Sequence, residues 1–73
     1  MMNDYKIEAT DTFGGEANYS WVARYTIQAN TERGALNKFA RIMGRGWRKD
    51  WSAGDVTRYT HKRDCVCVFI EQV

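Results

Sequence analysis

The residues best suited to bind a partner are cationic and gather in one part of the chain. Residues 33–63 hold nine of the eleven lysines and arginines of this 73-residue sequence against two acids, a net charge of +7, whereas residues 1–32 carry −3. Trp47, Trp51 and Tyr59 are interleaved with these cations. Cations bind phosphate through charge-assisted hydrogen bonds, and flat aromatic rings can stack on bases. The segment therefore predicts a partner that carries phosphates or is otherwise acidic.

The candidate nucleic-acid contacts run from a predicted helix into the segment after it. They are Lys38, Arg41, Arg45, Trp47, Arg48, Lys49 and Trp51. We expect the cations to contact phosphates and one of the two tryptophans to stack on a base. A second interpretation stays open at this point. Basic residues late in a helix stabilise its dipole, solvated cations need no ligand, and tryptophans can fill the core of a small domain.

The sequence gives little support for a catalytic site or a metal site. His61 is the only histidine, the carboxylates are scattered, and no serine or cysteine lies in a nucleophile-elbow context. Cys65 and Cys67 would lie on the same side of a strand, where a bridge between them is strained, and a closed zinc site needs about four ligands. We therefore expect a non-enzymatic protein with free thiols, no metal and no cofactor.

Alternation of polar and apolar residues predicts four strands to position these groups, over residues 5–10, 19–29, 56–61 and 65–73. The last strand is apolar on both sides, so we expect it to be central or covered on both faces. Residues 11–18 are expected to form a hairpin loop longer than the tightest types, and residues 47–54 to be irregular.

One helix is predicted after Thr31, which suits the N-cap, and it should end at Gly44 or Gly46. Its apolar stripe consists of Leu36, Phe39, Ala40 and Met43. The predicted fold is a single α+β domain over residues 1–73: a four-stranded, mainly antiparallel sheet in ββαββ order, with the helix packed on one face. The other face, to which we assign Thr57 and Tyr59 together with Cys65, Cys67 and Phe69, must be solvated, used for binding or paired in a dimer.

Residues 11–22 read DTFGGEANYSWV. This stretch resembles one found in small uncharacterised proteins of bacteriophages and prophages, and the likeness extends weakly to Ile27. The resemblance implies a mobile-element origin and a location in the host cytoplasm, and it implies no activity or site residues. In physical terms the stretch is a hairpin, and its length leaves Phe13 and Glu16 as candidate contacts to a partner.

These observations predict a small phage or prophage binding domain that contacts nucleic acid through its basic helix face and the Trp/Arg segment after it. The alternative is a phage accessory protein that binds and modulates an acidic host protein, for example part of the host defence machinery. The chain has no apolar run of membrane-spanning length and no signal-peptide core at its start, so we expect a cytoplasmic protein. A homodimer would add buried surface to so short a chain, and both oligomeric states stay open.

Overall fold

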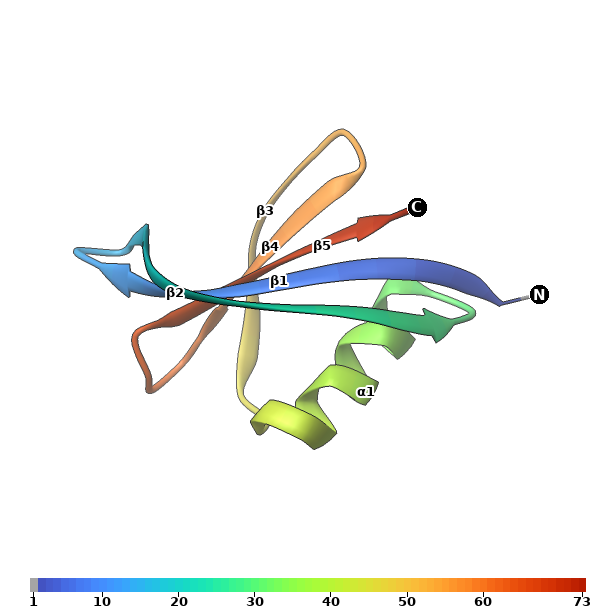
Figure 1. The fold of residues 1–73 in the computed structure, drawn as a ribbon, viewed down its shortest axis with the longest axis horizontal. Coiled ribbons are helices and arrows are strands. Elements are labelled where there is room, and N and C mark those ends of the chain that lie inside the picture. Colours follow the sequence, from blue (N-terminus) through green and yellow to red (C-terminus); the bar gives the residue numbers. More distant parts are fainter. Residues whose placement is uncertain (1) are drawn as a thin grey trace.

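Five strands and one helix make up the fold, which a computed structural model describes over residues 2–73 (Figure 1). The elements are β1 (Asn3–Phe13), β2 (Glu16–Ala29), α1 (Glu32–Met43), β3 (Trp47–Ala53), β4 (Val56–His61) and β5 (Val66–Gln72). The strands form one antiparallel sheet in the order β2-β1-β5-β4-β3. Helix α1 lies across one face, and we call the other the open face.

The prediction of four strands is wrong, although the α+β class agrees with the structure. The additional strand is β3, formed by residues that were expected to be irregular. The pairing of β3 with β4 shifts register between Lys49 and Trp51, which is a bulge at Asp50. A bulge reverses the inside–outside alternation of a strand. Trp47 and Trp51 therefore lie on opposite faces of the sheet, and the sequence shows no regular alternation here.

The expected long loop at residues 11–18 is also wrong, because β1 and β2 continue to a two-residue turn. Gly14 and Gly15 form this turn with φ of +62° and +85°. Both angles lie in the left-handed region, which glycine adopts without a steric penalty and which tight hairpin turns require. The Gly-Gly pair thus makes a tighter turn than its flanking polar residues suggested.

A large bulge lies just before this turn. Thr10 pairs with Val22 and Thr12 with Ala17. Between these two pairs β1 advances by two residues and β2 by five. The Asp11 carboxylate accepts hydrogen bonds from the Ser20 backbone N–H and from Asn18 Nδ2, both at 2.9 Å. Hydrogen bonding from the Ser20 side chain, and then from the Asn18 side chain, lowers the pKa of Asp11 from 3.8 to about 2. An ionised Asp11 thereby holds the extra residues of β2 in place.

The core lies between α1 and the sheet. Tyr5, Ile7 and Ala9 of β1 are buried, as their alternation predicted, and they pack with Phe39 of the helix. Strand β5 is confirmed as central, between β1 and β4, and its Val68 and Ile70 belong to the same core.

Two core assignments from the sequence are wrong. Thr57 and Tyr59 are buried under the helix rather than placed on the open face, because Tyr59 pairs with Val68 and Thr57 with Ile70. Met43, the last member of the apolar stripe, is 39% exposed, because the helix ends there.

The helix boundaries follow the predicted capping residues. Thr31 Oγ1 accepts a hydrogen bond from the Gly34 N–H at 3.0 Å, which satisfies one of the free N–H groups of the first turn. Gly44, with φ of +100°, closes the helix by donating its N–H to the Ala40 carbonyl at 2.8 Å. Both caps are confirmed, and the chain turns from here directly into β3.

Candidate nucleic-acid interface

The seven predicted contact residues are distributed over separate surfaces. Lys38 lies on the β2 side of α1, where its Nζ donates to the Gln28 carbonyl at 2.5 Å. Arg41 is exposed on the outer side of the helix. Arg48 and Trp51 belong to the open face, because they pair with Thr60 and Arg58 of β4. Arg45, Trp47 and Lys49 alone come together, on the helix side beside β3.

These three residues line a groove between α1 and β3 of about 210 Å³, which we call the basic groove. The lining residues are Arg33, Leu36, Asn37, Ala40, Arg45, Gly46, Trp47, Lys49 and Tyr59. Leu36, Ala40 and Trp47 supply apolar and aromatic surface. Three cations and the Asn37 amide supply the polar groups that an anionic ligand needs.

Helix geometry places Arg33 and Asn37 in the groove. Residues four apart in a helix lie on one side of it, and this pair flanks the apolar stripe on the side that faces β3. The sequence-based contact set did not include Arg33, Asn37 or Tyr59. The i, i+4 spacing of Arg33 and Asn37 beside Leu36 and Ala40 was the available signal, but the sequence does not show which side of the helix meets a strand.

The connection from α1 to β3 positions Arg45. Gly44 and Gly46 on either side of it both have positive φ, which lets the chain reverse direction. The Arg45 carbonyl is hydrogen bonded to His61 Nε2 at 2.8 Å. A side chain at position 46 would approach His61 Nε2 to 3.3 Å, so this glycine also permits close packing.

Trp47 forms the wall of the groove and is half-buried. Its ring centroid lies 5.6 Å from that of Phe39 and 4.9 Å from that of His61. Its Nε1 donates to the Gly44 carbonyl at 2.8 Å. The indole is therefore fixed by packing and a hydrogen bond, and only part of its surface is exposed.

The cations of the groove have no acidic partners. None of the ion pairs formed among residues 2–73 includes Arg33, Arg45 or Lys49. The acids adjacent to these cations in the sequence have other partners: Asp50 pairs with Arg58, and Glu32 accepts hydrogen bonds from the Thr57 hydroxyl at 2.9 Å and the Tyr59 hydroxyl at 2.8 Å. Burial, and then the hydrogen bond to Glu32, raise the pKa of Tyr59 to about 12. The groove thus gathers three cations that form no ion pair within residues 2–73, while the Glu32 carboxylate lies behind its Tyr59 wall.

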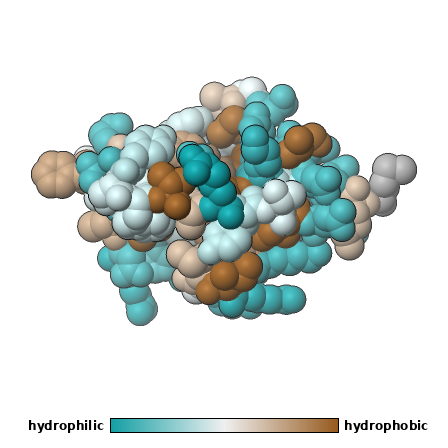
Figure 2. Space-filling view, in the orientation of Figure 1, coloured by the Kyte–Doolittle hydropathy of each residue, from teal (hydrophilic) through white to brown (hydrophobic). Residues whose placement is uncertain are grey.

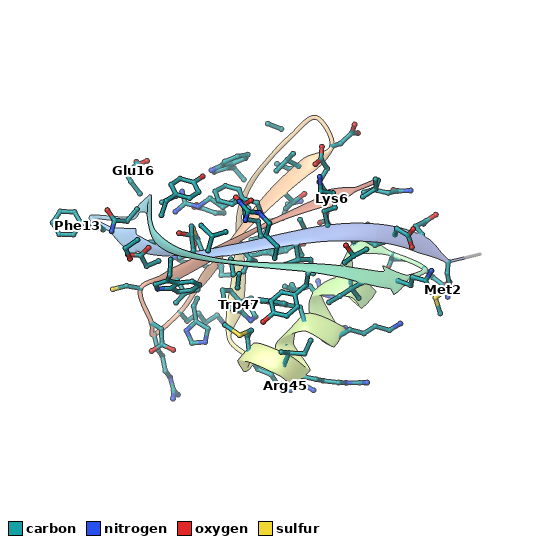
Figure 3. The ribbon with its side chains drawn as sticks, in the orientation of Figure 1. Met2, Lys6, Phe13, Glu16, Arg45 and Trp47 are labelled. Carbon is teal, nitrogen blue, oxygen red and sulfur yellow. The ribbon has the colours of Figure 1, made fainter. Side chains whose placement is uncertain are left out.

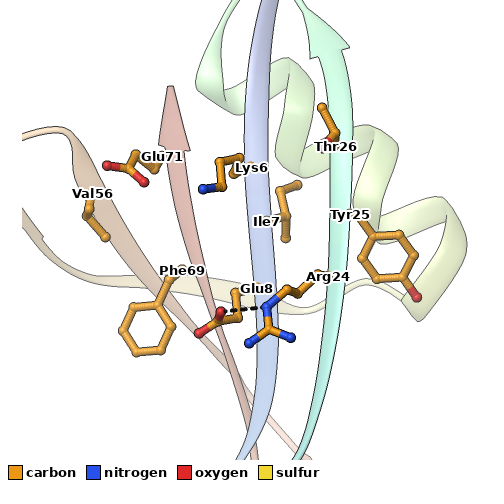
Figure 4. A pocket seen from close by; sticks show the side chains of 9 residues that line it. All are labelled: Lys6, Ile7, Glu8, Arg24, Tyr25, Thr26, Val56, Phe69 and Glu71. Carbon is orange, nitrogen blue, oxygen red and sulfur yellow. Dashed lines mark hydrogen bonds and ion pairs between the residues drawn. The ribbon is translucent and has the colours of Figure 1, made fainter. Parts of the chain in front are cut away.

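The open face differs in that it carries acids as well as bases, and two of its arginines, Arg24 and Arg58, form ion pairs. Glu8 and Arg24 form an ion pair at 3.2 Å beside a shallow pocket of about 350 Å³, with Lys6, Phe69 and Glu71 around it (Figure 4). The mixture of acids and bases gives this face little net attraction for anions. Trp51 is 42% exposed here and packs against Phe69 with ring centroids 6.2 Å apart.

A buried arginine on the open face holds the end of the β1–β2 hairpin. The side chain of Arg58 is 10% exposed, its Nη2 donates to the Gly15 carbonyl at 2.6 Å, and its Nη1 lies 3.3 Å from Asp50 Oδ2. Its Nε has no hydrogen-bond partner among residues 2–73. The hairpin is consequently bound to the face opposite the basic groove.

Residues 13–16, which we call the hairpin tip, project from one end of the molecule (Figure 3). Phe13 is 79% exposed, and Glu16, its cross-strand partner, is also exposed. The hydropathy view shows separate apolar residues among polar ones on this side of the molecule, rather than one continuous apolar patch (Figure 2). Phe13 is thus an isolated aromatic group presented to solvent.

No protein-family model, curated protein or solved structure matches this chain. Within residues 2–73, no three His, Cys, Asp or Glu side chains gather as a metal site requires, and both cysteines are free. The one helix of the described chain is too short and too polar to cross a membrane. Contacts and charges are therefore the basis for any assignment of function.

Proposed function

We propose that this chain is a small non-enzymatic domain that binds nucleic acid through the basic groove. One observation carries the proposal: Arg33, Arg45 and Lys49 surround a single groove, and none of them has an acidic partner among residues 2–73. Cations around one concave surface attract phosphate, because their fields add there. Of the other predicted contacts, Arg48 and Trp51 lie on the opposite face, and Lys38 and Arg41 lie elsewhere on the helix.

Each polar group of the groove has a distinct role in this proposal. The two arginines offer planar forks that make paired hydrogen bonds to phosphate oxygens, whereas Lys49 acts as a point charge. Asn37 can bond to a sugar or a base edge, and the exposed part of Trp47 offers an apolar contact to the sugar. Because most of these contacts go to the backbone, we expect weak sequence preference and steep salt dependence.

The test is a salt titration of binding to labelled single- and double-stranded DNA and RNA, followed by fluorescence anisotropy. Arg33→Ala, Arg45→Ala and Lys49→Ala should each reduce the salt slope by about one, since each removes one phosphate contact. Arg48→Ala is the matched control on the open face and should leave the slope unchanged. Equal slopes for the wild type and all three groove variants would refute the proposal.

A phage or prophage origin and a cytoplasmic location belong to the same proposal. The origin is supported only by the resemblance of residues 11–22. The location is supported by two free cysteines, of which Cys65 is exposed, because exposed thiols persist in reducing compartments.

One observation favours a second candidate function, the modulation of a host protein. Phe13 is 79% exposed on a hairpin tip that is held rigid, as an anchor for a protein partner would be. A stoichiometric host protein that co-purifies with the wild type after nuclease treatment, and is lost from Phe13→Ser, would support this function. Retention by Phe13→Ser would exclude the tip as its docking site.

A further inference from the structure

The hairpin tip is preformed and carries one apolar group. Phe13 projects from the end of the hairpin, beyond the body of the domain (Figure 3). The glycine turn, the hydrogen bond from Arg58 to the Gly15 carbonyl and the bonds that Asp11 accepts all fix its shape. A rigid anchor loses little conformational entropy when it docks, which favours binding.

The tip and the basic groove are complementary in charge and in polarity. Glu16 pairs across the turn with Phe13, and Asp11 lies nearby in the same hairpin, so the aromatic ring is accompanied by negative charge. The groove offers the reverse arrangement, with apolar surface from Leu36, Ala40 and Trp47 and cations around it. Opposite charges around matching apolar groups favour one specific orientation of contact.

A chain cannot fill its own groove with its own tip. Arg58, which holds Gly15, lies between Thr57 and Tyr59 on β4 and points to the open face, whereas the groove lies on the helix side. The sheet separates the two within one molecule. Only the tip of another molecule can enter the groove.

We propose that the hairpin tip of one chain docks in the basic groove of a second copy, with Phe13 on the apolar surface and Glu16 paired with a groove cation. The contact joins two different surfaces, so it is a heterologous one. It rests on the groove assigned under the proposed function and adds a regulation of it, because a docked tip occupies the space that nucleic acid requires. The tip and the groove are small, so the association is weak and dynamic.

The experiment is sedimentation velocity of nucleic-acid-free protein from micromolar to millimolar concentration. The wild type should self-associate with increasing concentration and dissociate with added salt. A tip variant, Phe13→Ser with Glu16→Lys, and a groove variant, Arg45→Glu with Lys49→Ala, should each stay monomeric. An equimolar mixture should form a complex of two chains and nothing larger, since each partner retains one functional half of the contact.

Ile42→Ser is the matched control, because Ile42 is 57% exposed on the helix away from the groove and its loss should not alter association. All substituted side chains are exposed, and circular dichroism verifies that each variant is folded. A wild type that stays monomeric at millimolar concentration would overturn the proposal. So would a tip variant that associates like the wild type, or a mixture of tip and groove variants that stays monomeric.

Nucleic-acid binding by the same variants distinguishes a failure of the docking proposal from a failure of the proposed nucleic-acid function. The tip variant should bind nucleic acid at least as tightly as the wild type, and more tightly at concentrations where the wild type associates. If the groove variants bind nucleic acid with the same salt dependence as the wild type, the proposed function is contradicted, whatever the outcome for self-association. If the protein both self-associates and binds nucleic acid, but nucleic acid does not dissociate the self-associated form, the regulation proposed here is contradicted.

Discussion

Replacement of Arg58 by methionine tests how the hairpin tip is held. The Arg58 guanidinium is buried on the open face and links Gly15 of the hairpin turn to Asp50 of the β3 bulge. Methionine has an unbranched side chain of similar length, so it keeps most of the apolar packing and removes the polar links. We expect a less stable domain with a more mobile hairpin tip.

The magnitude follows from three contributions. Loss of the charge-assisted bond to the Gly15 carbonyl, 2.6 Å long, costs about 1.5–3 kcal/mol. Loss of the Asp50 pair adds less than about 1 kcal/mol, because the Asp50 side chain is 42% exposed and already hydrated. The substitution also removes the buried Nε that has no hydrogen-bond partner, and this stabilises the variant by about 1 kcal/mol. The net loss is about 0.5–3 kcal/mol, and its midpoint corresponds to roughly 10 °C in Tm for a domain of this size.

Urea unfolding followed by tryptophan fluorescence measures this loss, and amide hydrogen exchange of residues 13–20 reports the mobility of the hairpin. The matched control is Arg24→Met, which removes the exposed Arg24–Glu8 pair from the same face and should cost less than about 0.5 kcal/mol. An Arg58→Met variant as stable as the wild type would show that desolvation of Nε cancels the bond to Gly15, and the reasoning would fail.

Two further predictions concern pH. The pKa of Tyr59 is about 12, above its usual 10, so the stability that it contributes is complete below pH 10 and is lost as the pH rises to 12. Urea unfolding should show that the wild type loses about 1 kcal/mol more than Tyr59→Phe between about pH 9 and pH 11, and equal losses would contradict the assignment of the raised pKa. The effect of Asp11 on stability has the opposite dependence on pH. Its pKa of about 2 lies below its usual 3.8, so the stability that the ionised carboxylate contributes is present above about pH 4 and is lost as the pH falls toward 2. The Tm advantage of the wild type over Asp11→Asn should shrink over that interval, and a constant advantage would mean that the Asp11 charge does not hold the bulge.

The parts of the fold that could be predicted are those in which one local pattern decides the outcome. Tyr5, Ile7 and Ala9 alternate with polar residues, and a strand with one buried face must show this pattern. Thr31 and Gly44 are capping residues whose effect depends only on the neighbouring turn of helix. Such features require no knowledge of distant residues.

The errors arose where a residue's position depends on the pairing of strands. The bulge at Asp50 reverses the alternation of β3, which hides the strand in the sequence. Trp47 and Trp51 are both candidate contacts in one segment of the sequence, but the sheet separates them. The same bulge places Lys49 in the groove while Arg48 and Trp51 lie on the open face. Charge density along the sequence indicated the correct segment but could not identify the face to which each cation belongs.

The positions of the groove cations argue for a ligand rather than for solubility as the reason for the basic groove. Cations that serve only to keep a protein in solution need not gather around one groove from separate parts of the chain, as Arg33 of α1, Arg45 of the connection and Lys49 of β3 do. Here Arg24 and Arg58 have carboxylate partners on the open face, whereas Arg33, Arg45 and Lys49 have none among residues 2–73. Two acids are adjacent to them in the sequence: Asp50, which pairs with Arg58, and Glu32, which accepts hydrogen bonds from Thr57 and Tyr59 under the helix. Neither carboxylate forms an ion pair with a groove cation, and a phosphate is the partner that this arrangement favours.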